Sequence, residues 1–379
     1  MKKAVSLVIL TSLLFSLGAP AALAEGEELG VSVSASAAIV LEPETGSVLY
    51  EKNADERMLI ASTTKIMTAL VVLEHCELDE SVEVTWTHAA TEGSSMYLDP
   101  EKSYTAEDLL YGLLLVSGND AAAALADHVG GSMEGFAELM NDKAAQLGLE
   151  NTHFVNAHGL DAEGHYSSAR DLALITAAAL ENDDFHEIFS ARSYTLYGLT
   201  YVNHNKLLGS CEGCIGGKTG YTLACGRTLV SCAERGGMTL ICVTLRDPDD
   251  WNDHCALYDW AYSAYELVPF LTERARRVEV MSGLSEFAEL TTPDAGVLVS
   301  KTSAVQRKVY LPMFVYAPVM SGESLGRAEV WVDGELAGSE PIVCRSAVLT
   351  DETNLLSPWE RIKRALEIAG NAGVYYSRF

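Results

Sequence analysis

The sequence predicts an α/β protein of the α+β kind, in which one antiparallel sheet carries helices and a small all-β domain follows. Strand-like segments lie near both ends of the first 274 residues and enclose a helical middle. After Arg274 the composition changes to short β-rich runs. The chain has 379 residues, 48% of them apolar, which is too long for one ordinary domain and sufficient for a large core.

The first 24 residues have the pattern of a secretory signal peptide. Lys2 and Lys3 precede an apolar run over residues 5–17, and Ala22-Leu23-Ala24 supplies a cleavage site of the small-x-small type. The sequence therefore predicts an exported, extracytoplasmic protein. An uncleaved membrane anchor is the alternative, although the run is short for a membrane span.

The chain is strongly acidic, with a formal net charge of −27 at pH 7. Removal of residues 1–24 makes it more acidic still, because this segment carries lysines and no acid. A chain of this charge repels polyanions, so we expect no nucleic-acid partner.

The eight cysteines are not expected to have a functional role. Most of them lie in apolar segments, where a reduced cysteine behaves as a small hydrophobic residue. Cys211 and Cys214 form a C-x-x-C motif, but no second pair follows at the spacing of zinc ligands. A local disulfide is the alternative for an exported protein.

The larger first domain, predicted over residues 25–274, divides into strands, helices and strands. Residues 37–50 predict two short strands around a Pro/Gly turn, and a helix is expected to begin at Ser62. The chain is mostly helical between about residues 106 and 180. Residues 228–232 and 239–243 predict a β-hairpin, and another helix follows over about 251–267.

The second domain, predicted over residues 275–350, is all-β. Its β-rich runs cover residues 277–281, 296–299, 308–315, 329–332 and 341–344, and Asp333-Gly334 is a strong hairpin turn. An amphipathic tail helix is predicted over residues 351–379, with Ser357 and Glu360 as a capping box. Its short apolar face suits either weak contact with a membrane surface or docking on protein.

Ser62-Thr63-Thr64-Lys65 forms an S-x-x-K motif. On a helix the first and fourth residues share a face, so the Lys65 amine can reach the Ser62 hydroxyl. Serine is a weak nucleophile until a base takes its proton, and a buried lysine with a lowered pKa can be that base. Alone the motif is weak evidence, because a helix cap followed by a surface lysine has the same pattern.

Two further motifs are also weak when each is taken alone. Ser117-Gly118-Asn119 interrupts an apolar helical region, where a hydroxyl could relay a proton and an amide could bind a substrate carbonyl. Lys218-Thr219-Gly220 precedes the predicted hairpin. Its lysine and threonine could bind a carboxylate, and its glycine would let an extended peptide pair with an edge strand.

Together, the order S-x-x-K, S-x-N, K-T-G is typical of penicillin-binding proteins and class A β-lactamases. The sequence resembles the serine-type D-Ala-D-Ala carboxypeptidases, which are low-molecular-mass penicillin-binding proteins of the peptidase S11 family. The resemblance covers most of the chain and is carried by residues 45–50, 61–68, 117–121, 147–154, 158–161, 166–171 and 217–222. It implies a DD-peptidase fold of the serine β-lactamase type.

The resemblance also implies the roles of the site residues. Ser62 would be the nucleophile, Lys65 the proton acceptor and Ser117 a proton-transfer group. The substrate-binding residues would be Asn119, Lys218, Thr219 and Gly220. No cofactor or metal is implied. The partners would be a peptidoglycan stem peptide ending in D-Ala-D-Ala and β-lactam antibiotics as covalent inhibitors.

The chain departs from the family pattern at Tyr221, and two other functions are alternatives to a carboxypeptidase. Tyr221 stands where some relatives have histidine, so the pH profile and substrate preference can differ. A β-lactamase on the same fold is one alternative, but the middle of the chain has no Glu-x-x-x-Asn stretch of the kind that class A enzymes use for deacylation, and the extra β domain also argues against it. A non-catalytic β-lactam sensor or wall-binding module is the other. His158 and Arg170 are expected to be structural.

Overall fold

The computed structural model describes residues 30–293 and 296–351, and a few isolated positions of the tail. The predicted signal peptide and most of the predicted tail helix lie outside the described residues. The predicted capping box is present: the Ser357 backbone N–H donates to Glu360 Oε2 at 2.8 Å, and the Glu360 N–H donates to Ser357 Oγ at 3.3 Å. In the described part of the chain, no helix is long and apolar enough to cross a membrane.

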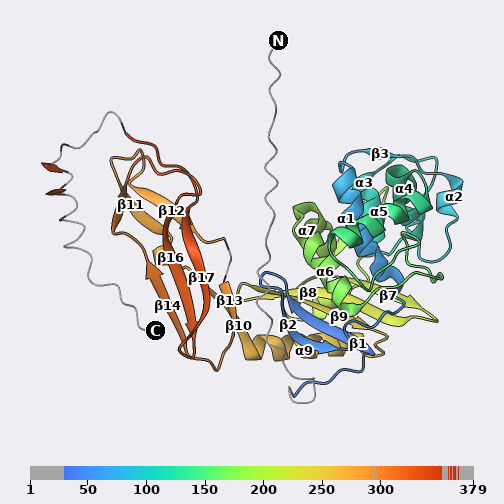
Figure 1. The fold of residues 1–379 in the computed structure, drawn as a ribbon. Helices are drawn as coiled ribbons and strands as arrows, with labels where there is room; N and C mark the ends of the chain where they lie inside the picture. The colour runs from blue at the N-terminus through green and yellow to red at the C-terminus, as the bar shows by residue number, and fades with distance from the viewer. Residues whose placement is uncertain are drawn as a thin grey trace, which may run out of the picture.

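A five-stranded antiparallel sheet is the centre of the first domain, as predicted from strands at both of its ends (Figure 1). The strand order is β2-β1-β9-β8-β7, so the N-terminal hairpin pairs with β9 from the C-terminal part. Strand β7 forms one free edge of this sheet. The strands are β1 (Ala37–Glu42), β2 (Ser47–Lys52), β7 (Cys214–Thr222), β8 (Gly226–Arg235) and β9 (Met238–Leu245).

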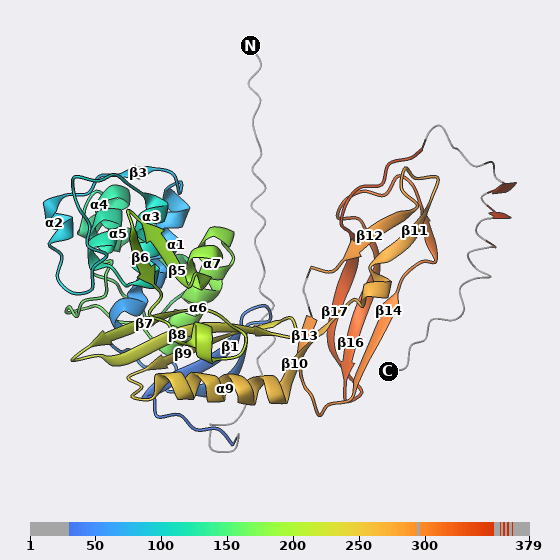
Figure 2. The same ribbon diagram turned by 180° about the vertical axis from the view of Figure 1, so that it is seen from behind.

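Helices cover both faces of the sheet, and Figures 1 and 2 show most of them on one face and α9 on the other. The long ones are α1 (Lys65–His75), α3 (Ala106–Leu115), α4 (Asn119–Gly130), α5 (Met133–Gln146), α6 (Ala169–Leu180), α7 (Asp183–Ser190) and α9 (Asp250–Ala264). Shorter elements are η1 (Ala61–Thr64), α2 (Trp86–Ala89), α8 (Leu207–Ser210), β3 (Ser81–Val82), β4 (Tyr104–Thr105), β5 (Ser193–Leu196) and β6 (Leu199–Val202).

The alternation of side chains along β1 explains why both faces are covered. Ile39 and Leu41 belong to the core under the large helical group, while Ala38 and Val40 belong to the core under α9. Side chains two positions apart on a strand share a face, so a strand that is apolar at every position needs packing on both sides.

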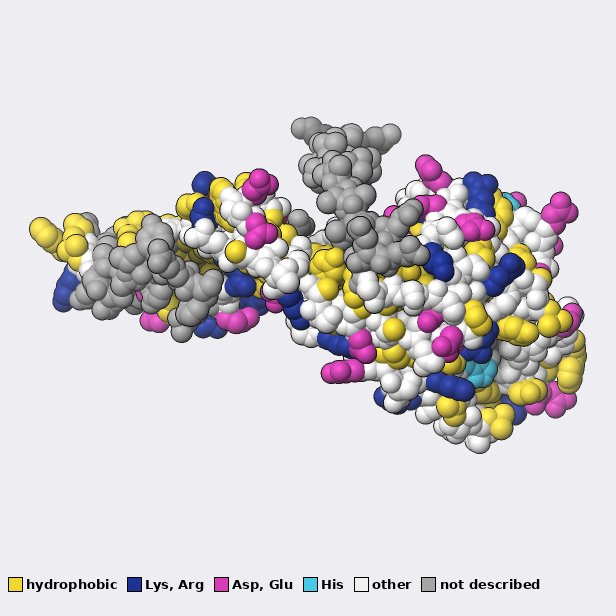
Figure 3. Space-filling model, turned by 90° about the horizontal axis from the view of Figure 1, so that it is seen from below, with side chains coloured by type: hydrophobic (Ala, Val, Ile, Leu, Met, Phe, Trp, Pro, Cys, Tyr) yellow, Lys and Arg dark blue, Asp and Glu magenta, His cyan; other side chains and the backbone are white. Residues whose placement is uncertain are grey.

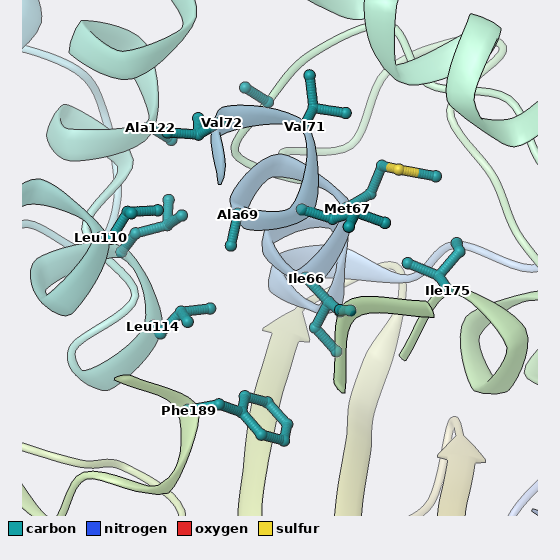
Figure 4. Close-up of a cluster of buried hydrophobic side chains, with 14 of the residues drawn as sticks. Ile66, Met67, Ala69, Val71, Val72, Leu110, Leu114, Ala122, Ile175 and Phe189 are labelled. Atoms are coloured by element: carbon teal, nitrogen blue, oxygen red, sulfur yellow. The ribbon is translucent and has the colours of Figure 1, made fainter. Parts of the chain in front are cut away.

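Helix α1 lies at the centre of the larger core. Figure 4 shows its apolar side chains surrounded by residues of α3, α4, α6 and α7. The side chains of Ile66, Met67, Ala69 and Val71 are at most 1% exposed. A helix that is apolar on nearly all sides packs against neighbours on each of them, and close packing holds it in place. The position of its first residue, Lys65, is set by this packing.

The second domain is all-β, as predicted, and its sheet order is β14-β16-β17-β12-β11-β15. Asp333 and Gly334 have φ values of 52° and 89° in the β16–β17 turn, which confirms the predicted hairpin. Residues 308–315, expected as one run, divide between β14 and β15, and β12 was not predicted. The strands are β11 (Arg277–Met281), β12 (Phe287–Thr291), β14 (Val305–Tyr310), β15 (Phe314–Tyr316), β16 (Ser324–Val332) and β17 (Glu335–Cys344).

The connection between the two domains is a short pair of strands. Helix α9 ends at Ala264, and the chain continues directly into β10 (Tyr265–Pro269), which pairs with β13 (Gly296–Ser300). The 3-10 helix η2 (Glu273–Ala275) follows β10. Val268 already packs in the core of the β domain, although the composition changes only at Arg274. The helix expected over 251–267 therefore stops three residues early, because its last residues enter the next sheet.

The cysteines are expected to be reduced and without a functional role, with a local disulfide as the alternative. All eight cysteines are free thiols, and five of them are buried.

On the face seen in Figure 3, acidic and basic side chains are interspersed, and basic side chains do not form a continuous stripe there. A stripe of that kind is the usual footprint of a surface that binds a polyanion.

Candidate active site

Ser62 lies in a 3-10 turn that leads into α1. The α-helix itself begins at Lys65, so the expected helix start at Ser62 is wrong by three residues. Ala61 has a φ of 47°, and the Thr63 backbone N–H donates to Ile60 O at 3.2 Å, which closes the tighter turn. Residues three apart nearly eclipse one another in a 3-10 helix, and Lys65 Nζ accordingly lies 3.0 Å from Ser62 Oγ.

The Lys65 amine is completely enclosed, with the residue 0% exposed. Besides Ser62, it contacts Asn119 Oδ1 at 2.7 Å and the carbonyl oxygen of His158 at 2.6 Å. A neutral amine has two N–H groups and one lone pair. Since the two carbonyl oxygens can take both N–H groups, the lone pair is left for the hydroxyl of Ser62.

The electrostatic surroundings favour the neutral amine. Burial, followed by the nearby Lys218 ammonium, lowers the pKa of Lys65 well below its usual value. Burial also lowers the pKa of Lys218, to about 7. No carboxylate is hydrogen-bonded to Lys65 among the described residues, and the Asp120 charge, which raises the Lys65 pKa, is a smaller effect than burial and Lys218.

The predicted S-x-N loop connects α3 to α4 and faces Ser62 across the cavity. Ser117 has a φ of 63°, which is a strained backbone for a residue with a Cβ. Within the described part of the chain its buried hydroxyl has no hydrogen-bond partner. Such a group is unfavourable in a resting core and is free to bond to a ligand.

Asn119, which is expected to hold substrate, also contacts the Lys65 amine. It begins α4 and is 3% exposed. Its Oδ1 accepts from Lys65, and its Nδ2 donates to Glu92 O at 2.6 Å. Both ends of the amide are thus bonded within the protein, and this amide orients the Lys65 amine. A substrate contact of Asn119 stays a prediction.

The K-T-G motif lies on β7, the edge strand, as predicted. Lys218 is 1% exposed, and its Nζ donates to the carbonyl oxygen of Thr219 at 2.8 Å. Thr219 and Gly220 line the cavity beside Ser62. A Cβ on Gly220 would lie 2.3 Å from Thr228 Oγ1 and 3.0 Å from the Ser62 backbone N, so only glycine allows β7 to approach the nucleophile this closely.

The cavity has a volume of about 330 Å³ and opens beside Ser62 and Ser117. Sequence reasoning missed several of its lining residues: Ser94, His204, Lys206, Arg227, Asp250 and Trp251. Arg227 donates to Asp250 through Nε at 3.0 Å and Nη2 at 2.6 Å and lies over the Trp251 ring. No short motif marks these residues, since β8, α9 and the loop after β6 bring them together only in three dimensions. Tyr221, which is 63% exposed, completes the rim.

A glycine loop supports the nucleophile from behind. Gly159 has a φ of 86°, and a Cβ there would lie 2.0 Å from Ala61 O. The preceding residue, His158, supplies the carbonyl oxygen that binds Lys65. Burial, followed by the charge of Lys65, lowers the pKa of His158 to about 4, so this side chain is neutral at pH 7. Arg170, by contrast, is bonded to Asp55 and Glu51 on the surface.

A serine bonded to a buried lysine with a lowered pKa, beside a buried hydroxyl without a partner in the described structure and a lysine on the edge strand, defines a serine acyl-transfer enzyme. The sequence profile of the D-alanyl-D-alanine carboxypeptidases, peptidase family S11, matches residues 22–249. The chain belongs to this family of serine hydrolases.

Curated relatives and solved structures agree with this assignment. The chain is 31% identical to the D-alanyl-D-alanine carboxypeptidase DacF of Bacillus subtilis, over 96% of this chain and all of the relative. It is 35% identical to DacC of Escherichia coli, over 82% of this chain and 84% of the relative. The crystal structure of penicillin-binding protein 5 from Haemophilus influenzae matches with a TM-score of 0.65 and 28% identity, covering 84% of this chain and 98% of that one.

Proposed function

We propose that this chain removes the terminal D-alanine from peptidoglycan stem peptides through an acyl-enzyme on Ser62. The observation that carries the proposal is the 3.0 Å contact between Lys65 Nζ and Ser62 Oγ, made by an amine whose pKa burial lowers well below its usual value. Such a pair is the minimal machinery for nucleophilic attack on an acyl carbon.

In the first step the Ser62 hydroxyl gives its proton to Lys65 while Oγ bonds to the carbonyl carbon of the penultimate D-alanine. The peptide bond then breaks, and the departing amine of the last D-alanine takes up that proton. Ser117 supports this transfer, because its buried hydroxyl has no partner in the described structure and lines the same cavity. In the second step water attacks the ester and restores the Ser62 hydroxyl.

Substrate binding is assigned to the edge strand. An extended peptide can pair with β7 at Thr219 and Gly220, and its terminal carboxylate is attracted by the Lys218 charge and the Thr219 hydroxyl. Arg227 also lines this cavity, where its guanidinium is paired with Asp250. β-Lactams present a similar acyl group and carboxylate, so they acylate the same serine.

The test uses two assays on the purified chain. We expect release of D-alanine from diacetyl-Lys-D-Ala-D-Ala, and a stable adduct of one penicillin per chain in intact-protein mass spectrometry. Ser62→Ala abolishes both. Ser94→Ala is the matched control, because Ser94 lines the same cavity but is not part of the S-x-x-K motif, and it keeps the adduct. An adduct on Ser62→Ala would refute the nucleophile, whereas rapid turnover of penicillin would favour a β-lactamase.

The location of this activity follows from its substrate. We propose that the chain is exported by its first 24 residues and acts outside the cytoplasmic membrane, where peptidoglycan lies. Contact of the tail helix with the membrane surface is a further proposal, supported by the apolar side chains of Trp359, Ile362 and Leu366, which are 51–80% exposed.

A further inference from the structure

Cys76, Glu80 and His128 converge at the end of the catalytic domain opposite Ser62. Their ligand atoms, one sulfur, one carboxylate oxygen and one imidazole nitrogen, all lie within 4.8 Å of one another. His128 Nε2 and Glu80 Oε2 are 3.3 Å apart. The residues come from three separate places: Cys76 follows α1, Glu80 precedes β3, and His128 is in the last turn of α4.

The position of this cluster relates it to two helices that carry the active site. Helix α1 begins at Lys65 and helix α4 begins at Asn119, and these two side chains are bonded at 2.7 Å. The same two helices pack along their length, and Figure 4 shows Ala122 of α4 directed toward α1. Cys76 and His128 lie at the C-terminal ends of the same two helices. The Lys65–Asn119 bond therefore joins the N-terminal ends of α1 and α4, and the cluster lies at their C-terminal ends.

The set of donor atoms suits a zinc-class divalent ion. Thiolate, imidazole and carboxylate are the three ligand types that zinc accepts, at about 2.3, 2.0 and 2.0–2.2 Å. Tetrahedral geometry at these lengths separates neighbouring ligand atoms by about 3.3–3.6 Å. The His128–Glu80 separation of 3.3 Å already fits, and a side-chain movement of about 1 Å brings Cys76 Sγ into the same range.

The surroundings orient one ligand and favour a cation. The Glu77 backbone N–H donates to Glu80 Oε1 at 2.8 Å, which leaves Oε2 directed at His128. Both helices present their C-terminal carbonyl groups here, the end that attracts positive charge. Cys76 and Glu80 also line an open cavity of about 580 Å³, whose other acidic residues are Glu74, Glu77, Asp79 and Asp184.

We propose that Cys76, Glu80 and His128 bind one zinc-class divalent ion, with water in the fourth position, and that the ion ties the C-terminal ends of α1 and α4 together. The ion has a structural role, since the site lies at the far end of both helices from Ser62. The proposal is independent of the reaction at Ser62. Binding displaces the thiol proton of Cys76, because the thiolate is the form of cysteine that ligates a metal ion.

The experiment titrates the reduced full chain with Co²⁺ and follows the thiolate-to-cobalt charge-transfer band in the near ultraviolet. We expect one ion per chain, competition by Zn²⁺, and release of about one proton per ion. Cys76→Ser abolishes the band. His128→Gln weakens binding at least by the roughly 10- to 100-fold that loss of an outer-shell partner costs.

Cys255→Ser is the matched control, because Cys255 is a second half-exposed thiol of the same domain that lies near Cys211. It leaves the band and the affinity unchanged. Absence of the band in the natural chain, an equal band in Cys76→Ser, or its loss in Cys255→Ser would each overturn the proposal. Should Cys76→Ser fail to fold, the affinity of His128→Gln decides in the same way.

Discussion

Replacement of Lys65 by methionine tests the assignment of the base most directly. Methionine keeps an unbranched apolar stem that reaches to the Cε position, with sulfur in place of Cδ, and lacks the amine. The base is then lost while Ser62 stays in place, and positioned proton transfer contributes about 10²- to 10⁴-fold to a rate. We therefore expect Lys65→Met to lower the acylation rate constant for penicillin by about 10²- to 10⁴-fold, equivalent to ~3–5 kcal/mol of activation free energy.

The same change has a calculable effect on stability. Asn119 Oδ1 and the His158 carbonyl oxygen lose the donor that lies 2.7 and 2.6 Å away. A buried acceptor left without a partner costs about 1–3 kcal/mol. Removal of the buried amine offsets part of this loss, so the free energy of unfolding is expected to fall by about 1–3 kcal/mol.

Stopped-flow acylation with a fluorescent penicillin and urea unfolding measure the two effects separately. Lys143→Met is the matched control, because the Lys143 amine forms a surface ion pair with Glu74 and does not contact the cavity. It should leave the acylation rate unchanged. A folded Lys65→Met chain that is acylated within tenfold of the natural rate would refute the role of Lys65 as base.

Three further predictions concern the neighbours of this pair. The pKa of Lys218 is about 7, so its positive charge is lost as the pH rises. We therefore expect kcat/KM for a peptide with a free carboxylate to fall above about pH 7. In Lys218→Met this fall in kcat/KM at alkaline pH is absent. Ser117→Ala slows the release of D-alanine about 10²-fold, because a proton-transfer group is lost. The urea midpoint of this variant stays equal or rises slightly, because a buried hydroxyl without a partner in the described structure is removed. A loss of stability would contradict this account. Gly159→Ala lowers the free energy of unfolding by about 2–4 kcal/mol, because the new Cβ clashes with Ala61 O. Gly148→Ala is the control: Gly148 has a φ of 70° and no atom within 4 Å of a Cβ, so this change costs only about 1–2 kcal/mol of backbone strain. Equal losses of stability in the two variants would show that the clash is not the cause.

The pH dependence of stability at Lys218 has a definite sign. Its folded pKa, about 7, lies below the usual value of 10.5 because the ammonium is buried. Between these two values the unfolded chain binds more protons than the folded chain, so the contribution of Lys218 to stability rises with pH in this window and is smallest below about pH 7. Urea unfolding of the natural chain and of Lys218→Met at several pH values separates this effect from that of other groups.

Local patterns in the sequence determined much of this protein. The three motifs singled out Ser62, Lys65, Ser117 and the β7 residues as candidates, because acyl-transfer chemistry requires these residue types at short, fixed spacings. The Pro/Gly turn within residues 37–50 and the Asp333-Gly334 turn predicted strands and a hairpin that the structure contains. These features depend on neighbours along the chain, so the sequence displays them directly.

The tertiary structure alone decided how the site works. It turned the Asn119 amide toward Lys65, supplied the His158 carbonyl oxygen from 93 residues away, and placed Arg227, Asp250 and Trp251 at the cavity. It also brought Cys76, Glu80 and His128 together at the far ends of α1 and α4. The S-x-x-K motif predicts a lysine with a lowered pKa, but the burial and the Lys218 charge that lower it come from groups distant in the chain, which only the folded structure brings around Lys65.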